Sequence, residues 1–156
     1  KNKNDNKEDN VKITSGKISI LFDPKNNVTI IPYTMNIYGR GKAADFSQFL
    51  YSKYKQEQLG FFVRNSMELS RKGNGITSEE LMESLGCKNW EVFSRNKRNI
   101  SMHFEEGKCI VINSTKRKKG GGYVFNVVGF EKIIKNDCSD SVLGYEVLDS
   151  LQKCRI

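Results

Sequence analysis

The chain has 156 residues, of which 37% are hydrophobic and 10% aromatic, and its formal net charge is +8. This length is enough for one domain with its own hydrophobic core. No apolar run reaches the roughly 18 residues of a membrane-spanning helix, and no signal-like stretch opens the chain, so we expect a cytoplasmic protein without a membrane partner.

The cysteine and histidine usage excludes the common metal frameworks. Cys87, Cys109, Cys138 and Cys154 are scattered without a Cys-x-x-Cys pair, and His103 is the single histidine. This spacing gives neither a zinc-ligand set nor a disulfide framework. We therefore expect reduced thiols, no metal and no cofactor.

The first part of the chain predicts a β-hairpin after a polar start. Segment 1–10 contains no apolar side chain, which predicts disorder. An alternating pattern at 18–22 and a β-branched run at 28–31 flank an Asp-Pro-Lys-Asn-Asn turn sequence. Pro32 cannot donate to a β-ladder, so it ends the second strand or places it at an edge. Segment 44–54 is ambiguous.

Helical patterns follow. Apolar residues at helical spacing predict a helix over 56–71. The Thr-Ser-Glu-Glu sequence that begins at Thr77 is a capping box, and it predicts a short helix that ends at Gly86. Asn89 can cap a second short helix, on which Trp90 is expected to pack within the domain rather than to form an exposed binding patch.

The second half begins like the first. Residues 100–104 and 109–112 predict a second hairpin with a tight Glu-Gly turn. A basic, glycine-rich and flexible loop is expected at 116–122, followed by strands over 123–128 and 131–135. A capped amphipathic helix closes the chain.

The chain thus repeats one plan, a hairpin followed by an amphipathic helix, in segments 18–71 and 100–155. A glycine lies early in each helix, at Gly60 and Gly144, and predicts close backbone packing there. Segment 77–95 has no counterpart and is interpreted as a helical insert.

These patterns predict one globular domain over 11–156 of the α+β class. The expected architecture is a central antiparallel β-sheet with packed helices, built from two similar hairpin-plus-helix halves.

No catalytic residue is predicted, because acid–base or nucleophilic chemistry would need a partner that the sequence does not specify. His103 alternates out of phase with apolar neighbours and is expected on the surface of a strand. The basic loop lacks the Walker pattern and precedes a strand, so a nucleotide cradle is excluded. It remains either a solvated hairpin tip or a docking surface for an acidic partner.

Segments 61–71, 73–90 and 143–151 resemble the immunity proteins of bacterial contact-dependent growth inhibition, the CdiI family. The most distinctive is the capping box with the Leu-Gly-Cys-Lys-Asn-Trp sequence at 85–90. The resemblance implies a non-enzymatic cytosolic inhibitor of a cognate toxin domain, often a nuclease, with β-augmentation at a sheet edge as one binding mode. Nuclease inhibitors are commonly acidic, whereas this chain is basic, so an acidic toxin face or a backbone-mediated contact is expected.

On this basis, toxin contact is predicted at the basic loop and the strand that follows it, namely at Lys116, Arg117, Lys118, Lys119 and Tyr123. Edge contact is also expected near Pro32. The alternative is a domain that binds single-stranded nucleic acid through basic and aromatic side chains. A hydrolase is the least favoured class.

Overall fold

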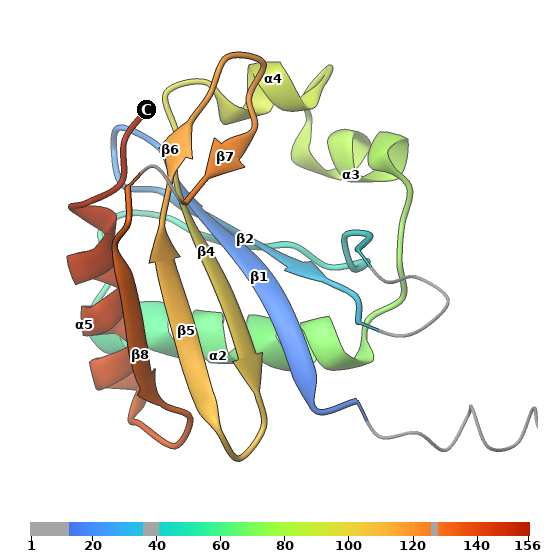
Figure 1. Ribbon diagram of the computed structural model, residues 1–156. Coiled ribbons are helices and arrows are strands. Elements are labelled where there is room, and N and C mark those ends of the chain that lie inside the picture. The colour runs from blue at the N-terminus through green and yellow to red at the C-terminus, as the bar shows by residue number, and fades with distance from the viewer. Residues whose placement is uncertain (1–12, 36–40, 126–127) are drawn as a thin grey trace, which may run out of the picture.

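The computed structural model describes residues 13–35, 41–125 and 128–156 (Figure 1). The predicted disorder of segment 1–10 lies outside these residues. The elements in chain order are β1 (Ser15–Phe22), β2 (Val28–Tyr33), β3 (Gln48–Leu50), α2 (Gln56–Lys72), α3 (Ser78–Leu85), α4 (Trp90–Ser94), β4 (Arg98–Glu105), β5 (Cys109–Ser114), β6 (Lys116–Arg117), β7 (Tyr123–Val124), β8 (Glu131–Lys135) and α5 (Asp140–Leu151).

Six of the strands form one antiparallel sheet in the order β3-β2-β1-β4-β5-β8. The two hairpins therefore lie side by side, joined by β1 and β4 at the centre. The pairing of β1 with β4 is symmetric about the pair Ser19–Ser101. On one side of this pair Ile18 lies opposite Met102, and on the other side Ile20 lies opposite Ile100. The predicted α+β class with a central antiparallel sheet is confirmed.

Local chemistry explains both hairpin turns. In the first, the Asp23 carboxylate accepts hydrogen bonds from the backbone N–H groups of Lys25 and Asn27, each at 2.9 Å. Such side-chain bonds fix a turn that would otherwise sample many conformations. In the second turn, Gly107 has a φ of 77°, which glycine adopts without a Cβ penalty.

One face of the sheet is covered by α2 and α5 (Figure 1). Helix α2 contacts β1, β2 and β3, whereas α5 contacts β4, β5 and β8. Alternate residues of the central strands pack between the sheet and these helices. The most deeply buried of them are Ile18, Ile20, Phe22, Ile30, Ile100, Met102, Ile110 and Ile112.

The two helices cross with their backbones in contact, which confirms the prediction from the paired glycines. A Cβ built on Gly60 would overlap the carbonyl oxygen of Asp140, and one built on Gly144 would overlap that of Gln56. Each glycine thus touches the first turn of the opposite helix. This reciprocity, like that of β1 and β4, is what a local twofold relation between the halves would produce, and the duplication itself stays a prediction.

The other face of the sheet is covered at one end by the insert that carries α3 and α4. The predicted capping box is confirmed, because Thr77 Oγ1 accepts from the Glu80 N–H at 3.1 Å and the Glu80 carboxylate accepts from the Thr77 N–H at 3.0 Å. Leu81 and Phe93 pack from the insert against Leu21 and Ile31 of the sheet. The insert and this end of the sheet therefore form a second, smaller hydrophobic core.

Three details differ from the sequence-based expectations. The strand predicted over 123–128 is only the two-residue β7, which pairs with β6 outside the main sheet, and residues 126–127 lie outside the described part. The ambiguous segment 44–54 contains the edge strand β3. Beyond β3, the edge of β2 near Pro32 is occupied, since the Pro32 carbonyl accepts from the Ala44 N–H at 2.8 Å. The backbone of β2 at Pro32 is therefore not free for strand pairing, and toxin contact near Pro32 stays a prediction.

Among the described residues, no helix is both long and apolar enough to cross a membrane.

Candidate functional site

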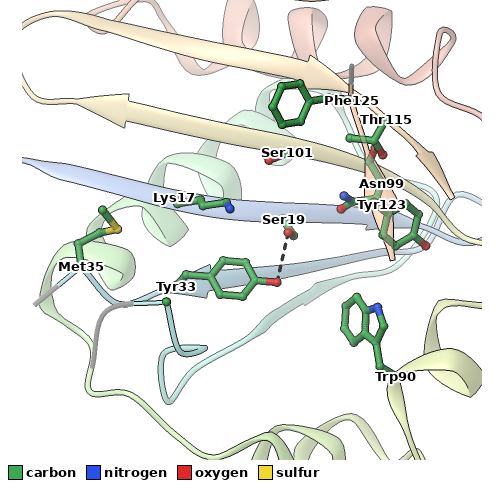
Figure 2. Close-up of a pocket in the computed structure, with 11 residues that line it drawn as sticks. Lys17, Ser19, Tyr33, Met35, Trp90, Asn99, Ser101, Thr115, Tyr123 and Phe125 are labelled. Atoms are coloured by element: carbon green, nitrogen blue, oxygen red, sulfur yellow. Dashed lines mark hydrogen bonds between the residues drawn. The ribbon is translucent and has the colours of Figure 1, made fainter. Parts of the chain in front are cut away.

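A pocket of about 510 Å³ lies on the face of the sheet that α2 and α5 leave uncovered (Figure 2). Its floor is polar and comes from the central strands, with Lys17 and Ser19 on β1 and Asn99 and Ser101 on β4. These residues alternate with the apolar residues that face the helices, because successive side chains of a strand point to opposite faces. The pocket volume is within the range typical of ligand sites.

Aromatic side chains form the walls, and they come from segments far apart in the chain. These residues are Tyr33 on β2, Trp90 on α4, Tyr123 on β7 and, after it, Phe125. The polar residues of the pocket floor were visible in the sequence, because they occupy every second position of the predicted strands. The pairing of the insert with the β6–β7 hairpin was not visible, so the pocket was missed.

The β6–β7 hairpin is fixed to the insert by hydrogen bonds. The Trp90 indole N–H donates to the Gly121 carbonyl at 2.7 Å, and Arg117 Nε donates to Ser94 Oγ at 3.2 Å. Gly121 has a φ of 98° and its Cα packs on Glu91, where a Cβ would lie 3.1 Å from Glu91 Cα. The basic segment is therefore a tight hairpin and not the flexible loop expected from its glycines.

The structure separates the five residues predicted to contact a toxin into two groups. Lys116, Lys118 and Lys119 are exposed at the hairpin. Arg117 and Tyr123 are half-buried and bonded to the insert, and of the five only Tyr123 lines the pocket. The exposed lysines can attract an anionic partner, whereas the other two side chains hold the hairpin in place.

Two tyrosines that line the pocket, Tyr123 and Tyr33, have raised pKa values. The Tyr123 hydroxyl donates to the Lys97 carbonyl at 2.7 Å, and burial raises the pKa of Tyr123 to about 12. Burial also raises the pKa of Tyr33, whose hydroxyl accepts from Ser19 Oγ at 3.3 Å. Both phenols therefore stay neutral and act as hydrogen-bonding wall groups.

The Tyr123 pKa predicts a loss of stability in alkali. A tyrosine in the unfolded chain has a pKa of about 10, whereas the pKa of Tyr123 in the folded protein is about 12. Between these values the unfolded state binds fewer protons, so the free energy of unfolding falls as the pH rises. Denaturant titrations across this range should show a shallower fall for Tyr123→Phe than for the wild type. The exposed Tyr51 provides the control, since Tyr51→Phe should keep the wild-type slope.

The histidine, cysteine and acidic side chains bear on metal binding and thiol chemistry. No group of three His, Cys, Asp or Glu residues that could hold a metal ion occurs in the described part of the chain. All four cysteines are free thiols, and burial raises the pKa of Cys154. His103 is exposed on β4 beside Lys17 of β1, as expected for a surface strand.

Fold and pocket together define a class of α+β domain, in which helices cover one face of an antiparallel sheet and the other face is partly open. The CDI immunity protein (CdiI) family model matches residues 10–154. The chain belongs to this family, and its resemblance to it is confirmed.

Solved structures agree with the fold. The toxin and immunity complex CdiA-CT/CdiI from Yersinia pseudotuberculosis contains a chain 14% identical, with a TM-score of 0.66 over 91% of this chain and 98% of that one. A protein of unknown function from Neisseria meningitidis is 16% identical, with a TM-score of 0.68 over 94% of this chain and 98% of that one. At these identities the likeness concerns the fold. No curated protein sequence matches.

Proposed function

We propose that this protein is the immunity protein of a contact-dependent growth inhibition system and neutralises its cognate toxin by stoichiometric binding in the cytoplasm. The observation that carries the proposal is the family match over residues 10–154. The complex from Yersinia pseudotuberculosis, which pairs a toxin with an immunity protein of this fold, supports it. The family is generally not catalytic, and binding alone would account for the function.

We further propose that the toxin is a nuclease, as the family resemblance implied. Inhibition would then require the immunity protein to cover or distort an active site that handles a polyanion. A basic inhibitor cannot do this as a nucleic-acid mimic, so contact would rest on shape, on backbone pairing and on acidic patches of the toxin. The open sheet edge at β8, five residues long, is available for β-augmentation, and Ile133 on this strand is 65% exposed.

The direct test begins with a search for a large secreted effector encoded next to this chain's gene, and it then uses the C-terminal domain of that effector. Co-expression should rescue cells from that domain, and the two purified proteins should form a stable one-to-one complex. Growth arrest despite co-expression, together with no complex by gel filtration, would rule out the proposed function. A salt-sensitive complex with single-stranded oligonucleotides in its place would support the nucleic-acid alternative.

The exposed lysines of the β6–β7 hairpin should speed the encounter with the toxin. Reversing Lys116, Lys118 and Lys119 to glutamate is expected to lower the association rate constant by about tenfold at low salt and less at high salt. Stopped-flow binding with labelled toxin domain measures this. The control is the same reversal at Lys25, Lys53 and Lys72, which are exposed on other parts of the surface. Equal rates for the two triple variants would exclude a special role for the hairpin.

A further inference from the structure

We propose that the pocket on the uncovered face of the sheet binds a short extended segment of the toxin, with a carboxylate at Lys17 and an amide group at Asn99 (Figure 2). The proposal rests on the proposed function and names the chemical groups of the toxin that this pocket would bind. Three observations carry it: an unpaired charge, an unpaired buried amide, and the distance between them.

The charge is that of Lys17, whose side chain is exposed at one end of the pocket. Its ammonium lies 5.9 Å from the centre of the Tyr33 ring, and it forms no ion pair with any residue that the structure describes. No aspartate or glutamate of residues 13–35, 41–125 and 128–156 lines the pocket. A cation held beside low-dielectric aromatic walls attracts an anion more strongly than one in open water.

The amide is that of Asn99 at the opposite end of the pocket. Asn99 is only 4% exposed, and its Oδ1 has no hydrogen-bond partner within the described part of the protein. Its backbone carbonyl is occupied, since Thr115 Oγ1 donates to it at 2.5 Å, so the strand is fixed while the side-chain oxygen has no donor among the described residues. A buried polar group without a partner costs about 1–3 kcal/mol. Another amide would satisfy it, because an amide carries both a donor and an acceptor.

The spacing of the two groups fits an extended peptide. Lys17 pairs with His103, and Leu21 pairs with Asn99, so the two ends lie four strand positions apart. At 3.3 Å per residue this separation is about 13 Å. A four-residue extended segment spans the same length. Ser19 and Ser101, both small, form the floor between the ends and leave room for it.

Single-stranded nucleic acid fits the same pocket less well. Bases bind by stacking on accessible aromatic faces, with several cations along the phosphates. Here Trp90 and Tyr123 are half-buried and use their polar atoms within the protein, and Lys17 is the one lysine or arginine among the lining residues that the structure describes. The chemistry therefore favours a peptide.

The experiment measures the affinity of the full-length protein for the cognate toxin domain by calorimetry. Lys17→Glu is expected to weaken binding by about 10-fold to 100-fold. Asn99→Leu keeps the branched shape of the side chain and removes the amide, so it should weaken binding about tenfold while the protein stays at least as stable as the wild type. Lys53→Glu is the matched charge control and should bind within about twofold of the wild type.

Two further measurements separate the possible failures. Ser101→Phe fills the middle of the pocket from a partly exposed position, and it should weaken binding even if Asn99→Leu misfolds. An Asp→Lys or Glu→Lys change in the toxin should restore binding to Lys17→Glu. If the wild type binds the toxin and the pocket variants bind equally well, the pocket proposal is overturned and the proposed function stands. If the wild type does not bind the toxin, the pocket proposal and the proposed function are both overturned. Pocket variants that change oligonucleotide binding alone would also overturn it.

Discussion

Replacing Gly60 or Gly144 with alanine is expected to lower the free energy of unfolding by about 3 kcal/mol, the upper end of typical overpacking costs. Elsewhere a Gly→Ala change in a helix stabilises, by roughly 1 kcal/mol. Here the new Cβ meets a backbone carbonyl of the facing helix, on Asp140 or Gln56, and a backbone group cannot rotate away as a side chain can. The helices must separate, which loosens the core beneath them.

Urea denaturation of the two single variants and of the double variant tests this. The double variant should lose less than the sum of the single losses, because one separation of α2 from α5 accommodates both new methyl groups. Asn65→Ala is the control, since Asn65 is exposed on α2 and its replacement should change stability by less than about 0.5 kcal/mol. Wild-type stability in Gly60→Ala would show that the helices do not touch at this point.

Removing the Arg64 side chain should have the second largest effect, a loss of about 2–3 kcal/mol in the free energy of unfolding. Arg64 on α2 donates to the Asp140 carboxylate at 2.9 Å, to the Asn136 carbonyl at 3.0 Å and to the Cys138 carbonyl at 2.5 Å. One guanidinium therefore ties α2 to the whole connection between β8 and α5. Arg64→Ala leaves two carbonyls without this donor.

Arg64→Lys separates geometry from charge. A lysine keeps the charge but lacks the planar fork of donors, so it should recover less than half of the loss. Asp140→Asn removes only a partly exposed ion pair and should cost less than about 1 kcal/mol. Thermal and urea unfolding measure all three variants, and similar losses for Arg64→Ala and Asp140→Asn would assign the effect to the ion pair alone.

Much of the fold could be predicted because its signals are local. The Asp23 turn, the capping box at Thr77 and the Asn89 cap each depend on residues within four positions of one another, and each is present. The prediction of a strand over 123–128 was wrong about its length and its place. The strand β7 pairs with β6 outside the main sheet, and the alternation of polar and apolar residues in a sequence cannot reveal such a pairing. Strand β3 was missed because an edge strand of three residues carries almost no pattern.

The candidate site was less predictable, and the reason is physical. The five toxin-contact residues were chosen for charge, and the structure gives Arg117 and Tyr123 a structural role through bonds to Ser94 and Lys97. Lys17 and Asn99 are ordinary strand residues in sequence. They matter only because the insert and the hairpin enclose the sheet face between them, and that enclosure depends on contacts between distant segments.

The central pairing of β1 with β4 also sets the order in which the protein can form during synthesis. Residues from 98 onward must leave the ribosome before β1 gains its inner neighbour, and α5 comes last of all the elements. Until then the first hairpin keeps one open edge, which favours aggregation, whereas α2 is already synthesised and can cover its apolar side. The sixth strand of the sheet, β8, is available only after residue 135 has been synthesised. Any activity that needs the whole sheet can therefore begin only late in synthesis.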